Sequence, residues 1–124
     1  MVHSPIDSLS KEARLKNLAE TRQQTAYEGY KNLGDFHNGG YECDFVSPYT
    51  KSANNVDSSV FVMLQDWASE DFLSGPFCAA TQQYGRTPDR PTNKNLDRLI
   101  KEHFQLSISE IYASNLFPFI KPSA

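Results

Sequence analysis

The sequence predicts an α/β domain in which helices flank a parallel sheet. Apolar residues run without alternation through residues 59–65 (SVFVMLQ), which is typical of a strand buried on both faces, as in parallel sheets. Residues 110–116 (EIYASNL) predict a second strand. Residues 93–104 predict an amphipathic helix between the two, so a right-handed crossover would join the strands in parallel.

The composition fits one folded domain. The chain has 124 residues, of which 39% are hydrophobic, too many for general disorder. Lys and Arg number 12 against 15 Asp and Glu, which gives a net charge of −3. This charge excludes a protein that coats nucleic acid by bulk positive charge, so any such contact needs a local basic patch. We predict a loose lead-in over residues 1–10 and a single α/β domain over residues 11–124.

The two cysteines and the N-terminal segment indicate where in the cell the protein is expected. Cys43 and Cys78 belong to no Cys-x-x-Cys or Cys/His cluster, which argues against a metal site. Two free thiols in a reducing cytoplasm are the simple interpretation, although a disulfide is open. The N-terminal segment lacks the basic and apolar regions of a signal peptide, and the longest apolar run, residues 60–64, is too short to cross a bilayer. We therefore predict a cytoplasmic protein that does not bind membranes.

The first half of the chain predicts one helix and one long loop. Residues 11–33 carry apolar side chains near one helical face, and Gly34 is a plausible end. Residues 34–58 are rich in Gly, Asn and Pro and predict a loop. The apolar positions of the predicted helix are Leu15, Leu18, Ala26, Tyr30 and Leu33.

The second half predicts a helix with one buried face. Residues 66–91 are irregular, and Thr92 would cap the helix over residues 93–104. Its apolar face is predicted to include His103 as a packed core histidine. The face consists of Leu96, Leu99, Ile100, His103 and Phe104, at spacings of i, i+3, i+4, i+7 and i+8.

Chemistry-bearing residues follow the two predicted strands. In open α/β sheets, ligands bind beyond the carboxyl ends of the strands, and parallel strands bring those ends to one edge. We therefore expect Asp66 and Asn115 to meet there. The carboxylate could orient water or stabilise a cation, and the amide could read a donor–acceptor edge. The alternative is that Asp66 caps a loop and Asn115 is an ordinary turn residue.

Three stretches resemble motifs of the uracil-DNA glycosylase superfamily, in the family's order. They are residues 65–78 (QDWASEDFLSGPFC), 85–96 (GRTPDRPTNKNL) and 111–122 (IYASNLFPFIKP). In that family a buried strand ends in a Gln-Asp pair, a Phe follows in a Gly-rich loop, and a later strand ends in Asn. The resemblance covers residues 60–122 and implies a three-layer α/β fold, of which this chain would hold the front part.

The resemblance implies a base-excision hydrolase of DNA repair that needs no metal and no cofactor. A nucleotide of single- or double-stranded DNA would be flipped into a pocket, and uracil or a related deaminated base would be released. Asp66 would stabilise the oxocarbenium-like sugar and position water. Phe77 would stack on the base, Asn115 would hydrogen-bond its edge, and Trp67 would exclude the thymine methyl. Backbone N–H groups near Gln65 would supply donors to the departing anion.

The same resemblance points to a DNA-binding loop. The second motif opens a helix beside the DNA backbone, and a helix N-terminus adds donors for a phosphate. Arg98 and Lys101, further along, are predicted to form only a solvated face. The predicted phosphate contacts are Arg86, Arg90, Thr92 and Lys94.

Departures from the family pattern keep alternatives open. Leu64 stands where a Gly usually precedes the Gln-Asp pair, Trp67 replaces Pro-Tyr, and the family's last motif, with its His, is not found. The alternative function is therefore a truncated or degenerate glycosylase-like module that at most binds nucleic acid. Phe77 and Trp67 could also be ordinary packing residues. A phosphohydrolase with Asp66 as nucleophile is disfavoured, because Ala68 stands where a second Asp is needed.

Overall fold

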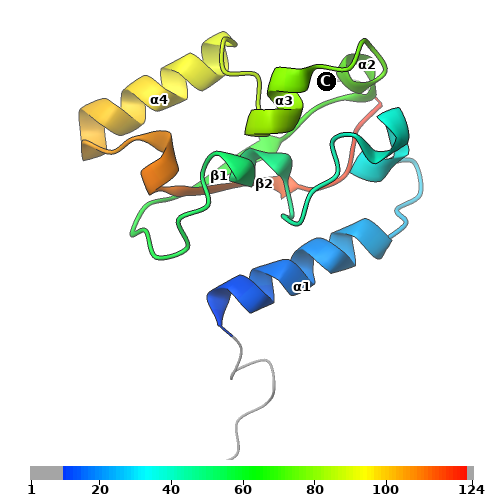
Figure 1. Cartoon of the computed structure of the whole chain (residues 1–124), viewed down its shortest axis with the longest axis horizontal. Coiled ribbons are helices and arrows are strands. Elements are labelled where there is room, and N and C mark those ends of the chain that lie inside the picture. The colour runs from blue at the N-terminus through cyan, green and yellow to red at the C-terminus, as the bar shows by residue number, and fades with distance from the viewer. Residues whose placement is uncertain (1–9, 123–124) are drawn as a thin grey trace, which may run out of the picture.

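The computed structural model describes residues 10–122 and has a mixed α/β architecture (Figure 1). A two-stranded parallel sheet and four α-helices are its regular elements over these residues, which confirms the α/β class. The elements are α1 (Lys11–Gln24), η1 (Leu33–Asp35), η2 (His37–Gly39), η3 (Pro48–Lys51), β1 (Phe61–Asp66), α2 (Glu70–Leu73), α3 (Ala79–Tyr84), α4 (Pro91–Phe104), η4 (Ile108–Glu110) and β2 (Tyr112–Phe117). Within this range no helix has the length and apolar character needed to cross a membrane.

The two strands pair in parallel, as predicted, and α2, α3 and α4 lie in the connection between them. The Cα partners run from Phe61 opposite Tyr112, through Leu64 opposite Asn115, to Asp66 opposite Phe117. Because the strands are parallel, their carboxyl ends meet at one edge of the sheet. This register puts Asp66 and Asn115 near that edge, in adjacent strands.

One face of the sheet forms the larger apolar cluster. Val62 and Leu64 of β1 and Ala113 of β2 pack with Ile100 of α4 and Tyr49 of η3. In Figure 1, α4 and α3 lie on one side of the strands, whereas α1 runs apart from them on the other. The helix over residues 93–104 therefore covers the sheet, as its apolar pattern indicates.

The opposite face of the sheet is exposed along β1 and at the end of β2. Phe61, Met63 and Leu116 are 56%, 48% and 72% exposed, and burial alternates along β1, whereas Tyr112 and Ser114 of β2 are buried on the same face. The prediction that the first strand is buried on both faces is wrong for the described chain, because β1 is covered on one face only. A continuous apolar run fails to distinguish a covered face from an uncovered one, since both carry the same residue types.

The first helix is shorter than predicted and has no apolar face. It ends at Gln24 instead of Leu33, because Gly29, at a φ of 87°, makes a tight turn closed by a bridge between Tyr27 and Tyr30. Leu33 packs instead in a second apolar cluster. Of the predicted lead-in, residues 1–9 lie outside the described range, and so do residues 123 and 124 of the predicted domain. Ser10 caps α1, its hydroxyl accepting from the Ala13 N–H at 3.1 Å.

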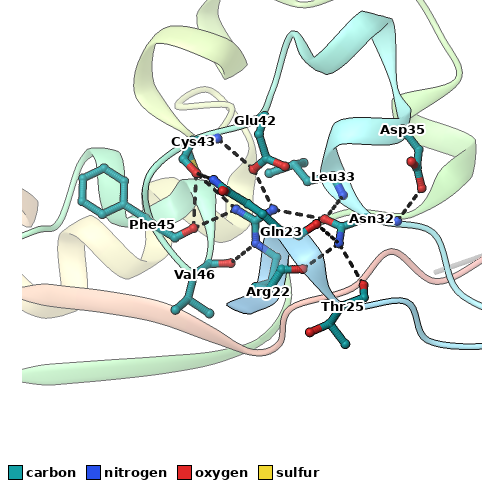
Figure 2. Close-up of polar contacts among 10 residues, drawn as sticks. All are labelled: Arg22, Gln23, Thr25, Asn32, Leu33, Asp35, Glu42, Cys43, Phe45 and Val46. Carbon is teal, nitrogen blue, oxygen red and sulfur yellow. Dashed lines mark hydrogen bonds and ion pairs between the residues drawn. The ribbon is translucent and has the colours of Figure 1, made fainter. Parts of the chain in front are cut away.

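A buried arginine anchors α1 to the rest of the chain (Figure 2). Arg22 is 3% exposed and forms an ion pair with Glu42 at 2.6 Å. Its guanidinium also donates to the carbonyls of Phe45 at 2.9 Å and Val46 at 3.2 Å, and to Asn32 Oδ1 at 3.1 Å. A polar network therefore holds this helix where the pattern predicted an apolar stripe.

The predicted loop over residues 34–58 contains three short 3-10 turns and covers the outer edge of β2. The Thr50 hydroxyl donates to the Ala113 carbonyl at 2.6 Å, and the Ala113 N–H donates to the Ala53 carbonyl at 3.0 Å. Asn54 forms a bridge with Tyr112. These bonds fix η3 against β2, beside the position of Asn115.

The boundaries and burial of α4 differ from the prediction in two respects. Arg90 is the N-cap and Pro91 opens the helix, so Thr92 lies in the first turn and is not the cap. Ile100 is buried, but Leu99, His103 and Phe104 are exposed, which corrects the prediction of a core histidine. The two-stranded sheet is too narrow to cover the whole apolar stripe of a 14-residue helix.

Candidate functional site

A cavity of about 410 Å³ opens at the carboxyl ends of β1 and β2. Its walls come from the end of β1, the α2 segment, the start of α4, β2 and the segment that follows β2. The expected convergence at this edge is confirmed, because residues from both strands line one cavity. The predicted site residues that line it are Gln65, Asp66, Trp67, Arg86, Arg90, Thr92 and Asn115.

Buried polar atoms without a hydrogen bond are concentrated in residues of this cavity. Over residues 10–122, three buried side-chain atoms lack a hydrogen-bond partner: Asp66 Oδ1, Arg86 Nε and Asn115 Nδ2. All three residues line the cavity. Buried polar groups are nearly always hydrogen-bonded, so a concentration of exceptions in one place is typical of a site that takes a ligand or water.

Asn115 is held in place by the backbone of β2 and by one side chain. It is 3% exposed, and its Oδ1 accepts a hydrogen bond from the Ser47 hydroxyl. Its Nδ2 has no acceptor among the described residues. One donor of this cavity-lining residue therefore stays unused within residues 10–122.

Asp66 ends β1 and faces a lysine that the sequence analysis did not assign to the site. Lys121 Nζ lies 3.1 Å from Asp66 Oδ1, without the angular geometry of a hydrogen bond, and both side chains are partly exposed. A bridge from Ser69 to Lys121, with the Glu70 N–H donating to the Lys121 carbonyl at 2.9 Å, fixes this segment. The available signal was a basic residue within the third motif, shortly after the strand.

Aromatic side chains form part of the cavity wall. The indole N–H of Trp67 donates to the Gly85 carbonyl at 2.7 Å. Gly85 has a φ of 70°, and a Cβ there would lie 1.7 Å from the Pro48 carbonyl oxygen, so only glycine fits. Phe72, which the sequence analysis missed, also lines the cavity, with the Arg90 guanidinium 4.7 Å from its ring centroid.

Phe77, the predicted stacking residue, lies outside this cavity. It is half exposed and stacks on Tyr41, with 4.9 Å between ring centroids, and its ring meets His37 edge-on at 5.5 Å. The structure therefore separates it from Asp66 and Asn115, because the segment after α2 carries it onto another aromatic cluster. The aromatic residues that line the cavity are Tyr49, Trp67 and Phe72.

Arg86 is occupied inside the fold. Its guanidinium makes a two-pronged pair with Asp97 at 2.7 and 2.8 Å and donates to the Tyr49 hydroxyl at 3.1 Å. The side chain is buried. Both terminal nitrogens of the group are thus used within the fold, tying the loop to α4, while Nε has no partner among the described residues and the contact with a DNA phosphate stays a prediction.

The other predicted phosphate contacts lie at or near the mouth of the cavity. Arg90 and Thr92 are exposed and line it at the start of α4. Lys94 is exposed in the same helical turn but does not line the cavity. Two of the four predicted residues thus flank the opening from the N-terminal end of a 14-residue helix.

Comparisons of the chain with protein-family models, with curated proteins and with solved structures found no match. Chemically, the cavity combines a carboxylate, an ammonium group, two guanidinium groups, a buried amide and three aromatic rings. Such a set suits a planar ring that carries a hydrogen-bond acceptor. Residues 10–122 contain no group of three or more His, Cys, Asp or Glu side chains arranged for a metal ion.

Proposed function

We propose that this chain is a DNA repair glycosylase that flips out and hydrolytically removes uracil or a related deaminated base. The observation that carries the proposal is the cavity at the sheet edge, which holds Asp66, the unpaired amide donor of Asn115 and the Trp67 ring together. The motif resemblance of residues 60–122 supports the same function. Under this proposal the α/β fold belongs to the three-layer class of that superfamily.

The proposed mechanism assigns one step to each group. The flipped base enters the cavity and its edge accepts a hydrogen bond from Asn115. As the N-glycosidic bond breaks, the Asp66 carboxylate stabilises the oxocarbenium-like sugar and positions water. The base departs as an anion, and the ammonium group of Lys121, beside Asp66, supplies nearby positive charge. Trp67 excludes the thymine methyl.

The DNA backbone would bind at the start of α4. Arg90 and Thr92 flank the cavity and Lys94 extends the surface, whereas the net charge of −3 argues against contacts spread over the whole molecule. The two cysteines are free in the fold, and a reducing cytoplasm, in which thiols stay reduced, is the proposed location.

The experiment is single-turnover release of free base from a uracil-containing single strand, with protein in excess at low salt. A deaminated-purine substrate runs in parallel. We expect Asp66→Asn to lower the rate by about 10²- to 10⁴-fold, since it removes the charge that positions water. Asp71→Asn, an exposed residue of α2 outside the cavity, is the matched control and should keep the rate. Equal rates in both variants would contradict the assignment of Asp66.

The alternative is a non-catalytic module of the same shape. The ion pair of Asp66 with Lys121 favours it, because the ammonium group occupies a carboxylate oxygen that would otherwise be free to contact water. Such a module would bind uracil-containing DNA without releasing the base. The same samples distinguish the two functions when binding, by fluorescence anisotropy, is measured beside release.

A further inference from the structure

Among the described residues, one lysine lines the cavity, and its amine lies beside a carboxylate. The side chain of this residue, Lys121, is 32% exposed, so it is neither sealed in the core nor free in solvent. Its Nζ lies 3.1 Å from Asp66 Oδ1 and 5.4 Å from the centroid of the Phe117 ring. The mechanism above uses this group only for its charge, although a lysine amine is also a nucleophile toward carbonyl carbon.

The backbone that carries Lys121 is fixed on two sides. Its carbonyl accepts a hydrogen bond from the Glu70 N–H at 2.9 Å. The preceding residue, Ile120, is buried and exchanges backbone hydrogen bonds with Lys31 at 2.9 and 3.3 Å. The flexible side chain of Lys121 is therefore the part that moves, and it can carry the amine from Asp66 to a bound molecule while the segment stays in place.

Base release would leave a carbonyl carbon next to this amine. When water replaces the base, C1′ of the deoxyribose carries a hydroxyl group, and the opened form of the sugar is an aldehyde. In the proposed mechanism the Asp66 carboxylate stabilises that sugar as the N-glycosidic bond breaks. Because Lys121 Nζ lies 3.1 Å from this carboxylate, the amine and C1′ would meet at one end of the cavity.

We propose that Lys121 forms an imine with the C1′ aldehyde of abasic deoxyribose and gives the chain a second activity, cleavage of the DNA strand by β-elimination. The inference rests on the proposed function for the placement of the sugar. Asp66 accepts a proton from the Lys121 ammonium group, and the neutral amine attacks C1′ to form a carbinolamine. Asp66 returns the proton to the carbinolamine hydroxyl, which leaves as water, so an ammonium ion and an aldehyde become an iminium ion and water.

Strand cleavage then follows from the iminium ion. Asp66, again a carboxylate, takes a proton from C2′, and the electron pair of the broken C–H bond forms an enamine. The enamine nitrogen returns its electron pair, a double bond forms between C2′ and C3′, and the C3′–O bond breaks with the phosphate as the leaving group. Water hydrolyses the remaining iminium ion, which frees the Lys121 amine and an unsaturated aldehyde.

The first test uses an oligonucleotide that already contains one abasic site, so it does not depend on base release. Sodium borohydride reduces an imine to a stable amine, and the full chain is expected to form a covalent complex with this DNA on a denaturing gel. A tetrahydrofuran site, which has no aldehyde, should give no complex. Mass spectrometry of the digested complex should place the adduct on Lys121. The absence of a complex, or an adduct on another amine, would overturn the inference.

The second test exchanges the amine. Lys121→Arg keeps a positive charge beside Asp66 but lacks the nucleophilic amine, so the complex and the cleaved strand should both be lost. Lys31→Arg is the matched control and should keep both, because Lys31 pairs with Glu70 at 3.2 Å but lies outside the cavity. Circular dichroism checks the folding of each variant, and Lys121→Gln replaces Lys121→Arg if the arginine prevents folding. An unchanged yield of the complex in a folded variant at position 121 would reject Lys121 as the nucleophile.

The outcomes separate this inference from the proposed function. Uracil release by the wild-type chain without trapping on abasic DNA would leave the glycosylase standing and reject the role of Lys121. Trapping on Lys121 without uracil release from DNA would support the strand-cleaving activity and reject the glycosylase.

Discussion

The anchor of α1 and the cavity at the sheet edge both bury polar side chains, but only one of them satisfies all its groups. Every nitrogen of the Arg22 guanidinium has a partner, among carbonyls, Asn32 and Glu42. In the cavity, Asn115 Nδ2 and Asp66 Oδ1 lack hydrogen bonds within the described chain. A satisfied network stabilises the fold, whereas unsatisfied groups cost stability and are kept where a ligand completes them. The contrast separates residues that hold the structure from residues that serve a site.

The largest expected effect on stability is at the anchor. Arg22→Met should lower the free energy of unfolding by about 3 kcal/mol, because it leaves Glu42 and several carbonyls without their donor. Urea denaturation followed by circular dichroism measures it. Arg14→Met, at an exposed position of α1, is the control, and Asp66→Asn should change stability by less than about 1 kcal/mol. A loss at Asp66 as large as that at Arg22 would end the distinction between the two regions.

A smaller effect on stability is expected at Arg86. This residue lines the cavity, as a ligand-binding residue would, but it also pairs with Asp97, as a structural residue would. Arg86→Lys keeps the charge and loses the two-pronged geometry, so unfolding free energy should fall by about 1–2 kcal/mol. Arg98→Lys, in the exposed pair with Glu102, is the matched control and should cost less than about 0.5 kcal/mol. Identical urea midpoints for the two variants would show that Arg86 is free for a ligand.

A still smaller effect is expected at the mouth of the cavity. Arg90→Gln should weaken binding to a uracil-containing oligonucleotide several-fold and reduce the salt dependence of affinity by about one unit of slope. Stability should hardly change, since the side chain is exposed. Fluorescence anisotropy at several salt concentrations gives the slope. Lys101→Gln, near the other end of α4, is the control, and an equal loss there would point to nonspecific attraction.

The smallest expected effect compares a thiol at the anchor with one outside it. Cys43 belongs to the anchor, because its backbone carbonyl accepts a hydrogen bond from Arg22, and burial raises the pKa of its thiol. A hydrogen bond from Thr81 lowers the pKa of the Cys78 thiol, which lies in the loop before α3. At neutral pH Cys78 therefore holds more thiolate and should react faster with iodoacetamide, as followed by mass spectrometry. Thr81→Val should slow Cys78 alone, and faster labelling of Cys43 would contradict this view of the anchor.

Local patterns predicted the elements near the cavity well. The apolar run before Asp66 and the run ending at Asn115 became parallel strands, because strand formation depends on residue types that are close in sequence. Their parallel pairing followed from the helix between them, and it brought the two chemical groups to one edge. The tendency of two strands joined by a helix to pair in parallel therefore predicted where the site lies, although no distance between its residues was known.

Contacts between distant residues account for the parts that the sequence analysis missed. Arg22 and Glu42, Arg86 and Asp97, and Asp66 and Lys121 are pairs whose partners no periodicity connects. The prediction that Phe77 stacks on a base depended on its spacing from Gly75 in the first motif. In the structure its ring stacks on Tyr41, outside the cavity. A long-range ion pair has no signal in a single sequence, since any of many opposite charges could supply the partner.

By itself, the sequence determined the α/β class, the parallel strands, the crossover helix and the meeting of Asp66 with Asn115, because each follows from local residue patterns and chain connectivity. The tertiary structure alone decided that β1 is covered on one face only, that α1 is held by a buried arginine, and that Asn115 turns its oxygen to Ser47. Those features depend on which side chains meet across large separations in the chain. Packing and hydrogen-bond geometry, which a sequence does not display, select among the available partners.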